Sequence, residues 1–314
     1  MVKRFSHLGQ VHIGLYGAVM GLAGLGLAAL AAAPLFPGVF RAPAYFTEPW
    51  ILLGALALAI LIPLYLLKGF SSLKADFTNP MLMGFCGALP VGMSLVAGGL
   101  GPYLPAFSQG LWWIAFTLLT AFQVWALARL LSGGLSIGEI NPGWLIILVG
   151  GIVVPGPGLS LGLAEASRFS FGISATVAPI LMALLFHRAI AGPALAEALR
   201  PTWFILLVPP SLIYANGLAL FPELVFLENL FSFALALGAA LLIFACGFPR
   251  WPFGPAWWAF TFPLDALAYA AARYAQDHPV PLWRGVCAAT LLLATAAVLI
   301  VLLRTLRNAA SRRA

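Results

Sequence analysis

The stretch NPGWLIILVGGIVVPGPG (141–158) is an apolar run with helix breakers in its second half. It is interrupted by Gly150, Gly151, Pro155 and Pro157. A proline inside a helix leaves a carbonyl of the preceding turn without its hydrogen bond and bends the helix. Lipid cannot satisfy that carbonyl, so such a segment belongs within protein or beside a water-filled cavity.

The rest of the chain is equally apolar. Of its 314 residues, 62% are hydrophobic and 8% are charged, and the mean hydropathy is +1.02. Soluble domains carry about 25% charged residues, whereas one helical crossing of a bilayer takes roughly 20 apolar residues. We therefore predict an all-α polytopic membrane protein that forms a single transmembrane domain over residues 1–314. Ten spans are expected, at about 12–33, 48–69, 79–101, 107–131, 143–165, 168–191, 201–221, 226–247, 256–276 and 283–306.

The basic residues predict the orientation of these spans. The net charge is +7 and the isoelectric point about 9.7, but the Lys and Arg residues lie at span ends and in short loops, so no nucleic-acid partner is expected. Twelve of the 16 lie on the side of the two termini, and the four on the other side are Arg41, Arg168, Arg273 and Arg284. The cationic side stays cytoplasmic. We expect a multi-pass protein of the cell inner (plasma) membrane with both termini in the cytoplasm.

Helix breakers are concentrated in the odd-numbered spans. Pro90, Pro155, Pro209 and Pro263 recur at intervals of 65, 54 and 54 residues. Span 1 lacks proline, but its glycines are spaced by three and four residues and therefore share one helix face. This pattern predicts five helical hairpins, each with one kinked, small-faced helix and one plainer helix, with all five odd helices running in the same direction.

The kinked helices are expected to lie inside and to surround a central passage, while the even helices face lipid. Glycine stripes in membrane helices also serve close packing, and this alternative stays open for any single stripe. The residues predicted to line the passage are Gly14, Gly17, Gly21, Gly24, Gly84, Gly87, Pro90, Ser94, Gly151, Pro155, Pro209, Pro210 and Pro263.

Polar residues narrow the function class. An enzyme, a metal site and a cofactor are not expected, because no HExxH motif, Cys-His cluster or phosphate-binding loop is present. Acidic residues in the spans are few, and cation channels usually require them. A passage that is lined by small apolar residues and has a positive electrostatic potential suits small anions, although a neutral solute would fit it too. Asp265 within span 9 and His12 at the start of span 1 are the candidate polar or titrating groups.

Five stretches together resemble one family, the tellurite-resistance/C4-dicarboxylate transporters, which include the plant guard-cell slow anion channels. The stretches are HIGLYGAVMGLAGLG (12–26), NPMLMGFCGALPVG (79–92), NPGWLIILVGGIVVPGPG (141–158), RPTWFILLVPPSLIYANG (200–217) and WPFGPAWWAFTFPLDALA (251–268). The resemblance covers all five odd spans. It implies ten helices in a quasi-five-fold ring, a pore lined by the odd helices, and a homotrimer in which each protomer has its own pore.

The resemblance also implies a phenylalanine that closes the pore from the ninth helix. The match places this gate at Phe262, with Phe260 as the second choice. The expected function is passage of small anions, meaning inorganic anions and also dicarboxylates or tellurite, across the lipid bilayer. The alternative is a proton-coupled secondary transporter of C4-dicarboxylates or oxyanions, in which Asp265 or His12 titrates during the cycle.

Overall fold

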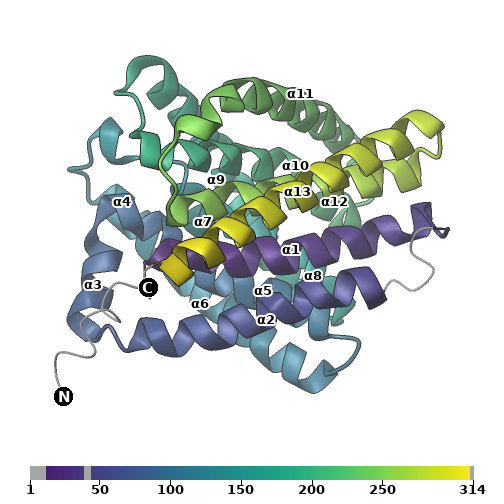
Figure 1. Ribbon diagram of the computed structural model, residues 1–314, viewed down its shortest axis with the longest axis horizontal. Coiled ribbons are helices and arrows are strands. Elements are labelled where there is room, and N and C mark those ends of the chain that lie inside the picture. Colours follow the sequence, from purple (N-terminus) through teal and green to yellow (C-terminus); the bar gives the residue numbers. More distant parts are fainter. Residues whose placement is uncertain (1–11, 39–43, 312–314) are drawn as a thin grey trace.

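The structure is a computed structural model that describes residues 12–38 and 44–311, and these residues form helices joined by turns, with no strand (Figure 1). The charged residues Lys3, Arg4, Arg41, Arg312 and Arg313, which contributed to the predicted orientation, lie outside this part of the chain. The α-helices are α1 Tyr16–Ala32, α2 Ala44–Leu66, α3 Phe70–Thr78, α4 Pro80–Met83, α5 Ala88–Leu100, α6 Pro105–Leu131, α7 Trp144–Val149, α8 Pro155–Ser160, α9 Ala164–Ala191, α10 Val208–Leu220, α11 Glu228–Phe244, α12 Thr261–Asp277 and α13 Pro281–Ser311.

Short 3₁₀ segments extend or interrupt several of these helices. Ile13–Leu15 precedes α1, Gly84–Gly87 joins α4 to α5, and Gly150–Ile152 separates α7 from α8. Glu197–Leu207 leads into α10 and Pro255–Phe260 leads into α12. The remaining 3₁₀ segments are Ala33–Leu35, Ile137–Glu139, Val225–Leu227 and Ala245–Arg250. All five interruptions named first fall in odd-numbered predicted spans, where the breakers lie.

Eight helical segments among the described residues are long and apolar enough to cross a membrane, as expected of a multi-pass membrane protein. They are Ile13–Leu35, Phe46–Leu66, Pro80–Leu100, Pro105–Leu131, Ala164–Ala191, Glu197–Leu220, Val225–Phe244 and Pro281–Ser311. Each agrees with a predicted span to within five residues at either end. The predicted spans 143–165 and 256–276 are not among the eight. Breakers shorten the first to Trp144–Ser160, and the second carries two charged residues, Asp265 and Arg273.

Inner and outer segments differ clearly in burial. In Ile13–Leu35, Pro80–Leu100 and Glu197–Leu220, 61, 83 and 78% of the most apolar stretch is buried within the protein. In the five even-numbered spans the same share is 22–39%, and large apolar side chains such as Leu131 and Ile190 are exposed there. Exposed side chains of this kind are compatible with lipid and not with water. The predicted division into inner odd helices and outer even helices agrees with this pattern.

The glycine stripe of α1 faces the helical segment 255–277. A methyl group added to Gly17 would lie 3.0 Å from the Cβ atom of Trp258, and one added to Gly24 would lie 2.8 Å from the Phe262 ring. Between these positions, Gly21 faces Thr261. The paired residue numbers rise together, so the two segments run in parallel, and α1 and α12 lie close together in Figure 1. Small residues allow this close approach.

The carbonyls freed by the breaks in 144–160 are satisfied by side chains of neighbouring helices. Asn216 Nδ2 donates to the Ile152 carbonyl at 2.8 Å, and Gln123 Nε2 donates to the Leu148 carbonyl at 3.1 Å. The Val154 carbonyl keeps its backbone bond from the Gly158 amide at 2.9 Å and also accepts from Trp112 Nε1 at 3.3 Å. The broken segment therefore lies within protein, as its prolines and glycines predicted.

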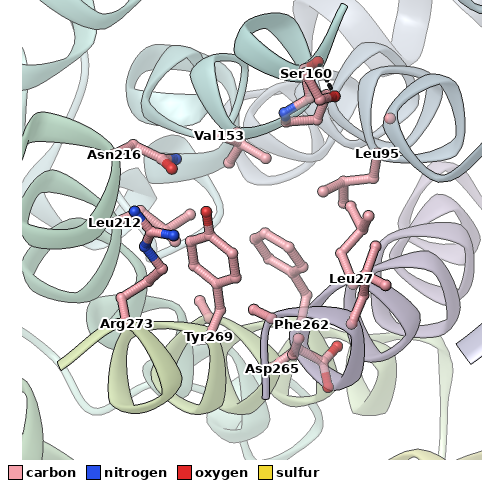
Figure 2. Close-up of a pocket in the computed structure, with 18 of the residues that line it drawn as sticks. Leu27, Leu95, Val153, Ser160, Leu212, Asn216, Phe262, Asp265, Tyr269 and Arg273 are labelled. Atoms are coloured by element: carbon pink, nitrogen blue, oxygen red, sulfur yellow. Dashed lines mark hydrogen bonds between the residues drawn. The ribbon is translucent and has the colours of Figure 1, made fainter. Parts of the chain in front are cut away.

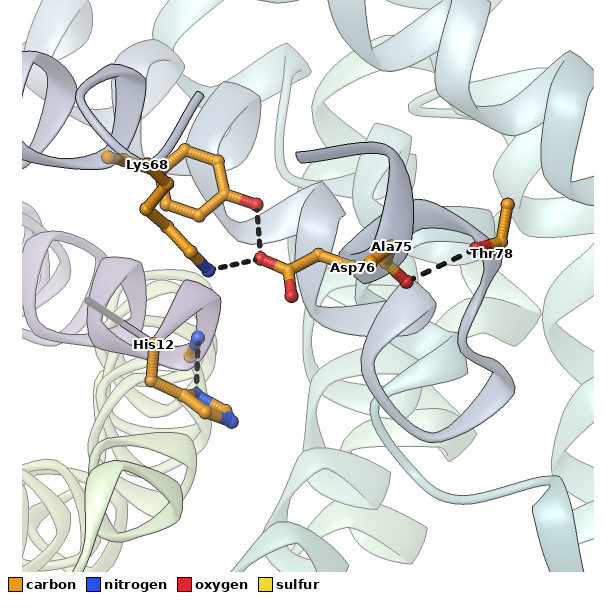
Figure 3. A network of polar contacts seen from close by, with 7 residues as sticks. His12, Lys68, Ala75, Asp76 and Thr78 are labelled. Carbon is orange, nitrogen blue, oxygen red and sulfur yellow. Dashed lines mark hydrogen bonds and ion pairs between the residues drawn. The ribbon is translucent and has the colours of Figure 1, made fainter. Parts of the chain in front are cut away.

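A short helix, α3, was not expected from the sequence, which suggested only a loop between spans 2 and 3. Its Asp76 is buried, accepts a hydrogen bond from Tyr65 Oη at 2.8 Å and pairs with Lys68 Nζ at 2.6 Å (Figure 3). An ion pair with this little exposure requires such additional hydrogen bonding to be tolerated. The pair holds α3 against the end of α2, near His12 at the start of the first span.

Candidate functional site

Two cavities lie along the centre of the helical bundle. The wide cavity has a volume of about 390 Å³. Its wall includes Asn216 of α10 and three polar residues of α12, namely Asp265, Tyr269 and Arg273 (Figure 2). These three residues are four positions apart, so they share one face of α12. The wide cavity therefore combines apolar walls with a polar side.

The narrow cavity has a volume of about 30 Å³. Among the described residues, its wall contains no charged side chain and no hydroxyl group. It is formed by Gly14, Gly17, Met20, Phe85, Ala88, Val91, Leu145, Ile146, Val149, Gly150, Val153, Ile205, Val208, Pro209, Trp258, Ala259, Phe262 and Pro263. A hydrated ion would lose its water here without receiving a polar replacement.

The same five segments line both cavities, and each comes from an odd-numbered predicted span. In the first segment, Gly14 of Ile13–Leu15 and Gly17 of α1 line the narrow cavity, and Gly24 of α1 lines the wide one. In α10, Pro209 lines the narrow cavity and the later residue Asn216 lines the wide one. The order also holds in the other three segments. All five segments thus run in the same direction, from the narrow cavity to the wide one.

Phe262 lies between the two cavities and lines both of them. It is the second residue of α12, is 5% exposed, and its ring extends into the wide cavity in Figure 2. Its neighbour Phe260 lines neither cavity and packs against Phe204 and Trp257, with ring centroids 5.8 and 6.1 Å away. Of the two phenylalanines considered from the sequence, Phe262 has the position that a plug requires.

The predicted lining residues separate into two groups. Gly14, Gly17, Pro209 and Pro263 line the narrow cavity, and Gly24 lines the wide one. Other residues occupy helix contacts: Gly84 faces the backbone of Gly143 and Trp144, and Gly151 faces Ser170 and Ser174 of α9. The predicted residues absent from both cavity walls are Gly21, Gly84, Gly87, Pro90, Ser94, Gly151, Pro155 and Pro210. For these positions the packing alternative accounts for the small residues.

Asp265 is a buried acid on the wall of the wide cavity. It is 1% exposed, and neither carboxylate oxygen has a hydrogen-bond partner among the described residues. The carboxylate points towards α1 (Figure 2), where a methyl group on Gly24 would lie 3.0 Å from Oδ2. A buried carboxylate without a partner is costly, and acids within membrane segments often serve the function of the protein. Asp265 therefore remains a candidate polar or titrating residue.

His12 precedes the first membrane segment and does not line either cavity. Its Nδ1 accepts a hydrogen bond from the Gly14 amide at 3.0 Å and so caps the segment Ile13–Leu15. Burial lowers the pKa of His12, nearby Lys68 acts in the same direction, and Asp76 opposes them. The neutral imidazole with a free Nδ1 lone pair is the form that can accept this hydrogen bond.

Arg273, Tyr269 and Asn216 were not selected from the sequence as site residues. Arg273 was counted only among the charges at span ends and in loops, and Asn216 was only part of the stretch 200–217. The spacing of Asp265, Tyr269 and Arg273 by four residues was the available signal. Among the described side chains, no group of three or more His, Cys, Asp or Glu residues is arranged to hold a metal ion.

The family assignment agrees with this architecture. Residues 10–306 match the family described as SLAC1, voltage-dependent anion channel. The chain belongs to this family. The resemblance based on the five kinked stretches is therefore confirmed over nearly the whole chain, including all five segments that line the cavities.

Several plant relatives of the voltage-dependent anion channel family are similar in sequence. The S-type anion channel SLAH3 of Arabidopsis thaliana is 25% identical over 83% of this chain and 42% of its own length. SLAH2 of the same plant is 26% identical over 73% and 45%. The guard cell S-type anion channel SLAC1 is 22% identical over 95% and 55%. This chain thus spans about half the length of these relatives.

Proposed function

We propose that this protein carries small anions across a membrane through a passage formed by the two cavities and closed by Phe262. The passage runs from the narrow cavity to the wide one, and the five inner segments form its wall. Anions are favoured over cations because Arg273 is the single basic residue described in either wall, and the relatives are named as anion channels. The only acid there, Asp265, points away from the passage towards α1.

The observation that carries this proposal is the position of Phe262 between the cavities. Its ring is buried and adjoins both spaces. A ring in a tube of small residues blocks the tube sterically, so its removal joins the two cavities. Phe260 is two residues earlier and adjoins neither, which makes it a natural control.

The test is anion flux into liposomes that contain the purified protein. Phe262→Ala is expected to raise flux by at least ~10-fold, the factor given by about 1.4 kcal/mol of barrier. Phe260→Ala is expected to leave flux unchanged, and Phe260→Leu replaces it if the alanine variant unfolds. Equal flux in wild type and a monodisperse Phe262→Ala variant would falsify the gate. A reversal potential that follows the cation gradient would reject the anion assignment.

A second function, proton-coupled transport of C4-dicarboxylates or oxyanions, is supported by Asp265. This acid adjoins the wide cavity three residues from Phe262 and has no protein partner in the described structure. In this scheme Asp265 takes up and releases a proton during the cycle, whereas His12, away from both cavities, has a structural role. The schemes differ in one measurement: at a clamped membrane voltage, a pH gradient drives substrate accumulation in a coupled transporter and not in a channel. Asp265→Asn abolishes that accumulation in the coupled scheme.

The proposed assembly is a ring of five hairpins, ten membrane helices in all, that associates as a homotrimer in the inner membrane. The described segments 144–160 and 255–277 supply the fifth and ninth helices. Both termini are assigned to the cytoplasm, because most loop cations are on their side. Reporter fusions at the C-terminus test the orientation, and chemical cross-linking in membranes tests for trimers. A periplasmic C-terminus or a monomer throughout contradicts the respective assignment.

A further inference from the structure

The polar side of the wide cavity has the composition of an anion-binding site. Arg273, Tyr269 and Asn216 extend into the same part of the cavity in Figure 2. Arg273 and Tyr269 are four residues apart on α12, and Asn216 comes from α10. A guanidinium, a phenol and a primary amide are all hydrogen-bond donors. The remaining wall residues are mainly Gly, Ala, Pro and Leu, so these donors stand out against an apolar surface.

The donors of this site are largely unused within the protein. Arg273 takes part in none of the ion pairs among the described residues, and its described hydrogen bond, to Gln276 Oε1, is long at 3.5 Å. The Tyr269 hydroxyl has no hydrogen bond among the described contacts. A methyl group on Gly156 would lie 3.9 Å from Tyr269 Oη, 3.8 Å from Asn216 Nδ2 and 3.4 Å from Asn216 Oδ1, an acceptor without a partner among the described residues. One hydrogen of Asn216 Nδ2 serves the Ile152 carbonyl, which leaves the other free.

Acidic residues lie near Arg273 on both sides of α12. Glu228 and Asp277 line a separate cavity that also includes Arg273 and Tyr214, but neither forms an ion pair with Arg273. Within the wide cavity, the carboxylate of Asp265 points away from Arg273 towards Gly24 on α1. The guanidinium is therefore available to a ligand in the wide cavity.

We propose that Arg273, Tyr269 and Asn216 form a binding site for a planar, singly charged oxyanion in the wide cavity, before the Phe262 plug. The proposal deepens the proposed anion passage and rests on it for its physiological role. A single cation in the wall balances one negative charge and not two. The planar guanidinium presents parallel N–H groups that match two oxygens of one anion, which favours a planar oxyanion over a halide.

The site is tested by nitrate binding to the purified protein in detergent, followed by calorimetry and by the nitrate dependence of the thermal unfolding midpoint. Arg273→Gln is expected to raise the half-saturating nitrate concentration at least ~10-fold, the effect of losing a charge-assisted contact. Tyr269→Phe removes one neutral donor and is expected to raise it a few-fold. Arg284→Gln is the matched control, because Arg284 is exposed at the start of α13 and lies outside the wide cavity.

Arg273→Lys separates planar recognition from charge alone. It keeps the charge and loses the parallel donors, so we expect weaker nitrate binding and a smaller preference for nitrate over chloride. Equal binding by wild type and Arg273→Gln overturns the site. Tighter wild-type binding of chloride than of nitrate overturns the planar-oxyanion class, and tighter binding of malate overturns the single charge.

These outcomes are independent of the gate experiment. Nitrate binding that needs Arg273 supports the site even if Phe262→Ala carries no flux, in which case only the proposed passage fails. Conversely, a large flux through Phe262→Ala together with unchanged nitrate binding in Arg273→Gln retains the passage and removes the site.

Discussion

The narrow and wide cavities are lined by the same five segments, yet they differ more than tenfold in volume, about 30 against 390 Å³. The narrow cavity has an apolar wall, and the wide cavity has Asn216, Tyr269 and Arg273. The difference teaches that one set of parallel helices can line two unlike spaces. In the passage that we propose, polar groups collect an ion at one end, and close packing of small and apolar residues restricts it at the other.

The largest expected effect comes from adding the same side chain to each cavity. In a Phe262→Ala background, Ala88→Phe places a ring in the narrow cavity, which has no room for it, and flux is expected to fall at least ~10-fold. Ala31→Phe places a ring in the wide cavity, which has room, and flux is expected to remain high. Liposome flux of both double variants measures this. Equal loss in the two would show that the cavities do not differ as barriers.

The next largest effect is expected at Gly24, which packs against the Phe262 ring. A methyl group on Gly24 would lie 2.8 Å from the ring, so the ring must move in Gly24→Ala. We expect anion flux to rise several-fold, less than in Phe262→Ala, because the ring is displaced and not removed.

Gly26→Ala is the control for the Gly24 variant. Its methyl group would meet Ile51 of α2 at 2.7 Å, on the opposite side of α1 from the ring. We expect lower thermal stability and unchanged flux. A similar rise of flux in both variants would mean that loosened packing, and not displacement of the ring, opens the passage.

A smaller effect is expected on the wall that the two cavities share. Gln123 of α6 supports the broken segment 144–160 through bonds to the Leu148 carbonyl and Ser174 Oγ at 3.1 and 2.7 Å. Gln123→Leu removes both of its bonds and leaves the Leu148 carbonyl with only the long 3.4 Å side-chain bond from Ser174 Oγ, which should cost about 1–3 kcal/mol of stability. Gln109 of the same helix is exposed, and it donates to the Leu161 carbonyl at 3.3 Å. Gln109→Leu is therefore expected to cost much less, as measured by thermal or denaturant unfolding in detergent.

The smallest effect is expected at His12, which caps the segment Ile13–Leu15. Because burial lowers the pKa of His12 below its ordinary value of 6.5, the unfolded chain binds its proton first as the pH falls. The stability contribution of His12 is thus complete above pH 6.5 and is lost as the pH falls through the folded-state value. Asp76 and Lys68 are the charged groups that act on His12 among the described residues.

His12→Asn isolates this contribution, since asparagine accepts the same capping bond and does not titrate. We expect the unfolding midpoint of the wild type to fall more steeply than that of His12→Asn between pH 6.5 and 5. Parallel pH profiles would assign the acid sensitivity to groups other than His12.

Part of the site could be predicted from the sequence, because prolines and glycines within an apolar run are recognisable without the structure. Pro209, Pro263 and the glycines of α1 identified segments that must avoid lipid, and their burial agrees. What the breakers could not distinguish was a cavity wall from a helix contact. Gly24 and Gly21 have the same spacing and chemistry, but Gly24 faces the Phe262 ring at the cavity and Gly21 faces Thr261 in a packed contact.

Polar residues were harder to place, because their role depends on partners distant in sequence. Asp76 looks like an ordinary loop acid, yet it is buried by contacts with Tyr65 and Lys68. Arg273 looks like a loop charge, yet it turns into the wide cavity. Asn216 meets the Ile152 carbonyl 64 residues away, a contact that no local pattern encodes.

The sequence by itself determined that this chain crosses a membrane many times and that its odd and even helices differ. The physical reason is that both properties are local. A long apolar run is stable in lipid, and a backbone group freed by a breaker is costly there. Only the tertiary structure decided which small residues face a cavity and that Phe262 and not Phe260 stands between two cavities. It also decided that Arg273 has no acidic partner within residues 12–38 and 44–311. Those facts depend on how five separate segments come together, which the spacing within one segment does not specify.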